Sequence, residues 1–200
     1  NEKLDLNLKA QLIRADTALR SFRDGGYTLA DAVGEMVDNA IQAGATETRI
    51  DWDVKEVREG RAKKAKRQVE WFAVADNGAG IAPQILPHVL TVGFSTRYGN
   101  REGIGRFGVG FKLASISQAR RLEVYTRPTY LKAIRQVDQD QNESWVMEEP
   151  NTTGRLFKTY LDLEEIDGGR QQEYTVEEVS ALPKDCGHLL NERVGTVIIW

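Results

Sequence analysis

The sequence predicts an α+β domain, a two-layer sandwich in which helices cover one face of a mixed, mostly antiparallel sheet. Two observations lead to this prediction. A segment near the N-terminus carries apolar residues at helical spacing, in a stripe wide enough to pack on a sheet. Several later segments alternate apolar and polar residues, as half-buried strands do. With 200 residues and 40% hydrophobic content, the chain suits one domain with a sizeable core.

Composition narrows the classes of function. A net charge of -3 does not suggest a generic nucleic-acid binder. The single cysteine, Cys186, excludes a disulfide within the chain, and two histidines, His88 and His188, are too few for a zinc site. We expect an intracellular protein, cytoplasmic or nuclear, with no membrane partner, because neither a membrane-spanning apolar run nor a signal peptide is visible. We also expect residues 1–200 to be the N-terminal domain of a longer protein.

The second predicted helix, Thr28–Ala45, is the most informative element. Thr28 and Asp31 fit a capping box, and Gly44 stands where a left-handed residue ends a helix. Its apolar stripe consists of Leu29, Val33, Met36, Val37, Ala40 and Ile41. Its polar face consists of Asp31, Glu35, Asp38, Asn39 and Gln42. Glu35 and Asn39, four residues apart, project together, although a solvated face would have the same composition.

Around this helix the chain alternates between regular segments and loops. Leu4–Phe22 has moderate helical periodicity and ends before a pair of glycines. Thr48–Val54 alternates as a strand with one buried face. Lys55–Gln68 carries seven basic and two acidic residues and is predicted to be a long, solvated hairpin connection. A phosphate-contacting loop on nucleic acid is the alternative for this segment.

A second strand, Val69–Ala75, ends directly in the sequence Asp-Asn-Gly-Ala-Gly-Ile. Asp76 would be a fixed acceptor at the strand end, beside glycines 78 and 80 that let the backbone approach a flat ligand closely. Asp-Asn-Gly is also a strong hairpin turn signal. The following residues look like a short helix with Pro83 near its first turn, which disfavours a two-residue hairpin.

A polar loop, Thr91–Asn100, leads into glycines 103, 105, 108 and 110, which precede an apolar helix starting near Phe111. Backbone amides and a helix N-terminus in this arrangement suit phosphate oxygens. The segment formally matches a dinucleotide pattern, but it follows a loop and no βαβ unit surrounds it, so we reject a Rossmann site. No Walker lysine motif occurs either.

The last third of the chain is predicted to add further strands to the sheet. These strands are Arg121–Arg127, Leu131–Val137, Glu143–Met147, Arg155–Leu163 and Val194–Trp200. Thr175–Leu190 is expected to include a short helix interrupted at Pro183. Cys186 is expected to be a buried, neutral thiol.

Four segments in order resemble the motifs of the GHKL superfamily of ATP-binding domains. They are GEMVDNAIQAGAT, DNGAGI, GFST followed by GIGRFGVGFK, and GTVIIW. The superfamily includes gyrase B proteins, ninety-kilodalton heat-shock chaperones, histidine kinases, MutL and MORC proteins. The resemblance extends from about Thr28 to Trp200 and implies the Bergerat fold.

The resemblance also implies roles for individual residues. Glu35 matches the general base that activates water, and Asn39 matches the ligand of Mg²⁺. Asp76 matches the acid that recognises the adenine amino group, supported by Thr196. The remaining nucleotide-binding positions are Gly78, Gly80, Ile81, Gly105, Phe107, Gly108, Val109, Gly110, Phe111 and Lys112. For Lys112, contact with a terminal phosphate and an ordinary solvated position stay open.

The implied function is a slow, Mg²⁺-dependent ATPase module. ATP would close a lid, Thr91–Gly105, and promote pairing of two copies of the chain, thereby controlling an attached domain. A nucleotide-binding sensor or scaffold with negligible hydrolysis is the alternative, and a histidine-kinase-type catalytic domain is a weaker one. DNA, a client protein and a second copy of the chain are all compatible partners.

Overall fold

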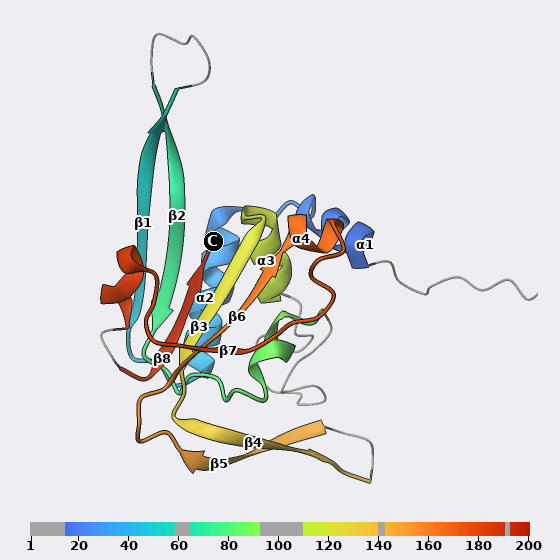
Figure 1. Cartoon of the computed structure of the whole chain (residues 1–200), viewed down its shortest axis with the longest axis vertical. Helices are drawn as coiled ribbons and strands as arrows, with labels where there is room; N and C mark the ends of the chain where they lie inside the picture. The colour runs from blue at the N-terminus through green and yellow to red at the C-terminus, as the bar shows by residue number, and fades with distance from the viewer. Residues whose placement is uncertain (1–14, 59–64, 93–109, 140–142, 191–192) are drawn as a thin grey trace, which may run out of the picture.

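The computed structural model describes residues 15–58, 65–92, 110–139, 143–190 and 193–200. Within these ranges the chain forms helices and strands in mixed order, as the α+β prediction requires (Figure 1). The helical elements are α1 (Ala15–Arg23), α2 (Leu29–Gln42), η1 (Leu86–Leu90), α3 (Gly110–Gln118), α4 (Leu163–Asp167) and η2 (Lys184–Leu189). The strands are β1 (Thr48–Val57), β2 (Lys66–Asp76), β3 (Arg121–Arg127), β4 (Tyr130–Val137), β5 (Glu143–Pro150), β6 (Leu156–Asp162), β7 (Glu177–Val179) and β8 (Gly195–Ile199).

The main sheet has the strand order β1-β2-β8-β3-β6-β7, and its neighbouring strands pair antiparallel. β8, the last strand in the sequence, therefore lies in the middle, between β2 and β3. Its register places Thr196 opposite both Asp76 of β2 and Thr126 of β3. Residues directly opposite one another share a face of the sheet, so three polar side chains form a row across its end.

Helices cover one face of this sheet, and the predicted fold class is confirmed. Figure 1 shows the helices on that face, and the core beneath them joins them to β2, β3, β6 and β8. Its buried residues are Leu19, Met36, Val74, Leu86, Leu90, Ile116, Leu122, Val124, Phe157, Leu161, Leu163 and Ile198. The capping box of α2 forms as predicted, because the Thr28 hydroxyl accepts from the Asp31 amide while the Asp31 carboxylate accepts from the Thr28 amide. Gly44 has the expected positive φ of 76°.

The apolar stripe of α2 is buried over a narrower width than its pattern predicted. Of the predicted stripe, Met36 and Ala40 are buried and Val33 and Val37 are half-buried, whereas Leu29 and Ile41 at the two ends of the helix are exposed. Ala32, outside the predicted stripe, is buried as well. Trp52 on the edge strand β1 is exposed as well, although its strand was expected to have one buried face. Hydrophobic periodicity reports which side chains share a face but not how far the covering element reaches. The helical layer leaves this edge of the sheet partly open.

The opposite face of the sheet has a cover of its own. The 3₁₀ helix η2 packs there against β2, β3, β6 and β8. It buries Cys186, and burial raises the pKa of that thiol to about 11. Cys186 is therefore a protonated core residue at neutral pH, as predicted.

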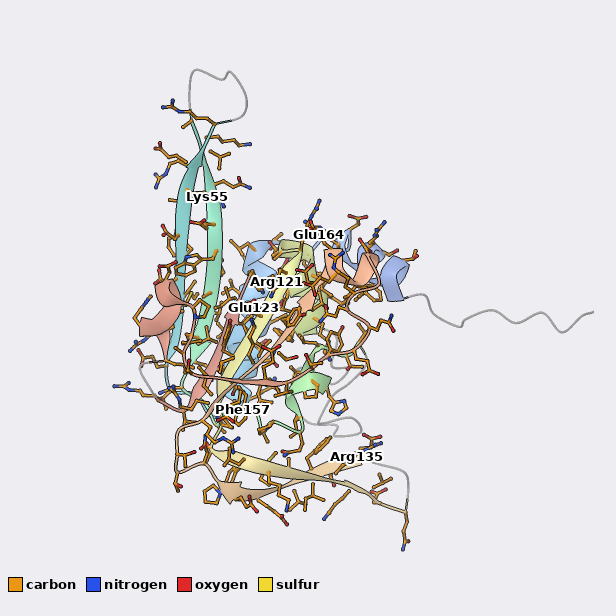
Figure 2. All side chains as sticks on the ribbon, in the orientation of Figure 1. Lys55, Arg121, Glu123, Arg135, Phe157 and Glu164 are labelled. Carbon is orange, nitrogen blue, oxygen red and sulfur yellow. The ribbon has the colours of Figure 1, made fainter. Side chains whose placement is uncertain are left out.

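Strands β1 and β2 are longer than predicted and continue into the basic segment that was expected to be a connection. They form a two-stranded ribbon that projects beyond the sheet, with side chains such as Lys55 standing out from it (Figures 1 and 2). All of Lys66–Glu70 is exposed. Backbone hydrogen bonds between two strands do not require apolar side chains, so strands can form in a charged segment. The charged residues therefore gave no sign that the strands continue here. Residues 59–64 lie outside the described ranges.

Strands β4 and β5 do not join the main sheet, which corrects the prediction for this part of the chain. In the described part of the chain they pair only with each other, and they form a separate hairpin beneath the sheet end (Figure 1). This hairpin packs against the segment that follows β2, burying Ala82, Ile85 and Ala133 together. Alternation predicts a strand but does not specify its partner.

Candidate functional site

A cavity of about 470 Å³ lies where α2, α3, the end of β2 and the start of β8 meet. It brings together most of the predicted site residues that the structure describes. Those that line it are Glu35, Asn39, Asp76, Gly80, Ile81, Gly110, Phe111, Lys112 and Thr196. Gly78 does not line it. Gly105, Phe107, Gly108 and Val109, with most of the predicted lid, lie outside the described residues.

Asp76 is the last residue of β2 and is held in place from two sides. The Gly78 amide donates to its Oδ1 at 2.8 Å, and the Thr196 amide also bonds to this carboxylate. Burial raises the pKa of Asp76, and the two backbone hydrogen bonds oppose that effect. Gly78 therefore orients the Asp76 carboxylate through its backbone amide and does not itself line the cavity. The result is an oriented acceptor at the end of a buried strand.

The Asp-Asn-Gly sequence is not a hairpin turn here. The Asn77 side-chain oxygen accepts from the amides of Thr46 and Glu47 at 2.8 and 2.9 Å. Asn77 thereby ties the loop after α2 to the end of β2. The chain then continues toward η1, as expected from the sequence after Ile81. This bond network fixes α2 relative to Asp76.

Gly80 allows a close approach between two backbone segments. It has a φ of 68°, and a Cβ there would lie 2.7 Å from Cα of Pro128. The neighbouring Ile81 amide donates to Oγ1 of the buried Thr126 at 2.9 Å, and this hydroxyl donates to the Gly195 carbonyl at 3.1 Å. Thr126, which no motif indicated, thus clamps this part of the cavity to β3 and β8. Close passage of a ligand past Gly80 stays a prediction.

Glu35 and the start of α3 are in direct contact. A Cβ on Gly110 would overlap the Glu35 carboxylate, so only glycine fits there without moving it. Glu35 is half-buried, and its pKa is raised first by burial and then by the nearby charge of Asp38. A carboxylate with a raised pKa beside a cavity is suited to accept a proton from water.

Lys112, in the first turn of α3, is only 3% exposed and lines the cavity. Burial lowers its pKa to about 8. The alternative that Lys112 is an ordinary solvated helix residue is therefore wrong. A buried cation is costly unless something it faces needs the charge, so its position is typical of a functional lysine.

The cavity is lined by two carboxylates, Asp76 and Glu35, together with the Asn39 amide and the Lys112 ammonium group. Residues 27–166 match the family described as "Histidine kinase-, DNA gyrase B-, and HSP90-like ATPase". The chain belongs to this family. The match covers the capped helix, the DNGAGI segment and α3, whereas β8, which contributes Thr196 to the cavity, lies outside it.

Curated relatives of this ATPase-family chain include the B subunit of type 2 DNA topoisomerase 6. The sequence from Saccharolobus islandicus is 27% identical over 159 residues, which is 74% of this chain and 29% of that protein. The sequence from Sulfurisphaera tokodaii is 28% identical over 176 residues, 80% of this chain and 32% of that protein. The chain thus spans about three tenths of these relatives. A solved N-terminal domain of a DNA repair protein covers 91% of the chain at 15% identity, with a TM-score of 0.45.

Besides Thr126, sequence reasoning missed three cavity residues from the β4–β5 hairpin. Tyr130, Trp145 and Met147 line the cavity, although none belongs to a family motif. The alternating pattern of β5 indicated a strand but gave no sign that the strand faces this site. The arrangement depends on long-range packing, which a local pattern does not specify.

The donor set of the cavity fits a magnesium ion that is shared with a ligand. Asn39 offers a side-chain amide oxygen, a hard ligand, one helical turn from Glu35. Among the described residues, no group of three or more His, Cys, Asp or Glu side chains could hold a metal by itself. Magnesium usually keeps several waters and takes phosphate oxygens, so one or two protein oxygens are enough.

Within the ranges that the structure describes, no helix is both long and apolar enough to cross a membrane.

Proposed function

We propose that the chain binds ATP in this cavity and hydrolyses it with the help of Mg²⁺. The observation that carries the proposal is the meeting of two kinds of group in one cavity. Asp76 and Thr196 suit recognition of a base, whereas Glu35, Asn39 and Lys112 suit phosphate chemistry. Membership of an ATPase family supports this assignment.

At the base end, Asp76 accepts a hydrogen bond from the adenine amino group. The amides of Gly78 and Thr196 hold the carboxylate before the ligand arrives, so little ordering is needed on binding. Thr196 supports recognition from the neighbouring strand, directly or through water. Adenine is thus read by a charged acceptor at a fixed position.

At the phosphate end, the first turn of α3 faces the nucleotide. Gly110 and Phe111 supply backbone amides near the positive end of the helix dipole, and Lys112 supplies a cation. Gly105, Phe107, Gly108 and Val109 are proposed to complete this cradle. We infer that Lys112 contacts a terminal phosphate, because this buried cation lines the cavity.

Glu35 acts as the general base. Its position against Gly110 puts the carboxylate beside the proposed phosphate cradle. The carboxylate takes a proton from the attacking water, and the raised pKa brings its basicity closer to neutral pH. General bases of this kind contribute about 10² to 10⁴ in rate.

Asn39 would hold Mg²⁺ through its side-chain oxygen, together with phosphate oxygens and waters. When bound, the ion supplies positive charge that neutralises the phosphate oxygens. Glu35 lies one helical turn from Asn39 and is not proposed as a ligand of the ion, so its carboxylate stays available to accept a proton.

The proposed biology follows from the nucleotide cycle. ATP closes the lid, Thr91–Gly105, and favours pairing of two chains, and slow hydrolysis reverses both steps. We favour DNA over a client protein as the target, because the curated relatives are named as parts of DNA topoisomerases. An intracellular location and a single domain over residues 1–200 remain predictions. A sensor with negligible hydrolysis, or a kinase, would use the same cavity without this turnover.

The test is the affinity for ATP of Asp76→Asn, measured by calorimetry with Mg²⁺. We expect a loss of at least tenfold, since hydrogen bonds to charged groups contribute roughly 1.5–3 kcal/mol. Asp53→Asn, on the exposed part of β1, is the matched control and should bind as the unmodified chain does. Unchanged affinity in Asp76→Asn would refute this pocket. Transfer of labelled phosphate to the protein, instead of release, would favour the kinase.

A further inference from the structure

The β4–β5 hairpin forms one wall of the cavity, yet no motif of the family includes it. It lies beneath the end of the main sheet (Figure 1). The cavity is lined there by residues of both β2 and β3. Tyr130 lines the cavity from β4, and Trp145 and Met147 line it from β5. This wall is apolar and aromatic, whereas the charged groups of the cavity come from α2, β2 and α3.

The hairpin is fixed relative to the site by contacts at several points. The Thr129 amide donates to the Ala79 carbonyl at 2.8 Å, and the Ala133 amide donates to Oε1 of Gln84 at 3.0 Å. Ala133 is also buried in a small core with two residues of the segment between β2 and η1. These contacts join the hairpin to the chain directly after Asp76. Its cavity-facing side chains are therefore positioned by the same segment that forms the base end of the site.

Alternate residues of β5 line the cavity, and one of them, Met147, is also 43% exposed. Trp145 and Met147 line the cavity, and the ring of Trp145 also lies 6.0 Å from that of His88. Val146, between them, is 41% exposed and stands opposite Ile134, which is also exposed. Successive residues of a strand point to opposite faces. Trp145 and Val146 are thus neighbours on one strand, and Val146, which points away from the cavity, is a matched control for substitutions of Trp145.

We propose that Trp145, together with Met147, forms the wall against which the purine base and ribose of the nucleotide pack. This makes the hairpin a determinant of nucleotide affinity, and the inference rests on the proposed function. An indole presents a broad apolar face to a flat base, and a thioether makes favourable contacts with aromatic rings. Asp76 reads the edge of the base, while Trp145 contributes contact area. The phosphates interact with α3 instead.

The division of roles predicts a pattern across ligands. Trp145→Ala should weaken ATP, ADP and AMP by about the same factor, because all three share the base and ribose. Stacking of a base on an aromatic side chain corresponds to a change of roughly 5- to 150-fold. Val146→Ala should bind all three as the unmodified chain does. Lys112→Met should instead weaken ATP more than AMP, because the base contacts are kept.

The experiment is calorimetry of these variants, combined with tryptophan fluorescence. AMP should quench part of the fluorescence of the unmodified chain, and Trp145→Phe should lose that change while keeping most of its affinity. Because Trp145→Phe preserves an aromatic ring, this readout also decides the case if Trp145→Ala does not fold. Full affinity in Trp145→Ala, or an unchanged quench in Trp145→Phe, would overturn the inference. If Asp76→Asn also binds normally, the proposed function fails; if it does not, only the hairpin wall fails.

Discussion

Replacing Lys112 by methionine should make the protein more stable and a poorer binder of ATP. Its pKa falls from the usual 10.5 to about 8 because the side chain is buried. Holding that charge in the fold at neutral pH therefore costs on the order of 3 kcal/mol. Methionine has a similar length and no charge, so we expect the free energy of unfolding to rise by up to about that amount. Affinity for ATP should fall, because the cation proposed to meet a phosphate is gone.

The destabilisation caused by the Lys112 charge should decrease as the pH rises. Above pH 8 the folded chain loses the Lys112 proton, whereas the unfolded chain keeps it until about pH 10.5. The penalty is therefore fully present below pH 8 and is relieved as the pH rises from 8 to 10.5. The gain from methionine should shrink over the same range. Urea unfolding followed by circular dichroism at pH 7 and at pH 9.5 measures both quantities.

Two control variants isolate the buried charge. Lys66→Met removes an exposed lysine of the β1–β2 ribbon and should leave stability almost unchanged. Lys112→Arg keeps a cation and should bring no stabilisation. The reasoning is refuted if Lys112→Met is no more stable than the unmodified chain at pH 7. Unchanged affinity for ATP in that variant would remove Lys112 from the phosphate site.

Three further predictions concern the chemical step. Glu35→Gln should bind ATP normally and lose about 10²- to 10⁴-fold in phosphate release; equal turnover would show that Glu35 is not the base. In the unmodified chain, turnover should fall on the acid side at a pH above 4.5, the usual glutamate value, since burial raises the Glu35 pKa and the base must be ionised. Gly110→Ala should displace the Glu35 carboxylate and slow turnover while AMP affinity is retained. Turnover at the normal rate in Gly110→Ala would show that catalysis does not depend on this position of the Glu35 carboxylate.

The parts of the site that local sequence encodes were predictable. The cap of α2 needs only Thr28 and Asp31, three residues apart, and the structure has it. Asp76 and Thr196 are distant in sequence, and only the resemblance to a family placed them together, which the sheet register then explained. Local patterns work where the interaction is itself local.

The parts that depend on long-range packing were not predictable. Trp145 lies in an ordinary alternating strand, and its cavity-facing position depends on contacts of the hairpin with the segment after β2. The burial of Lys112 has the same origin, since a lysine early in a helix is ordinarily solvated. Ile41 shows the converse, because an apolar position at the end of the stripe is left exposed by the reach of the sheet.

The central position of β8 has a consequence for how the protein folds. Until residues 195–199 insert between β2 and β3, the sheet exists only as two separate halves. Closing such a gap between segments far apart in the chain is slow, because loop-closure entropy is lost before the contacts form. The two halves expose unpaired edges during that interval, which makes this stage the one most open to aggregation. We therefore expect nucleotide-binding competence to appear late, with the insertion of the last strand.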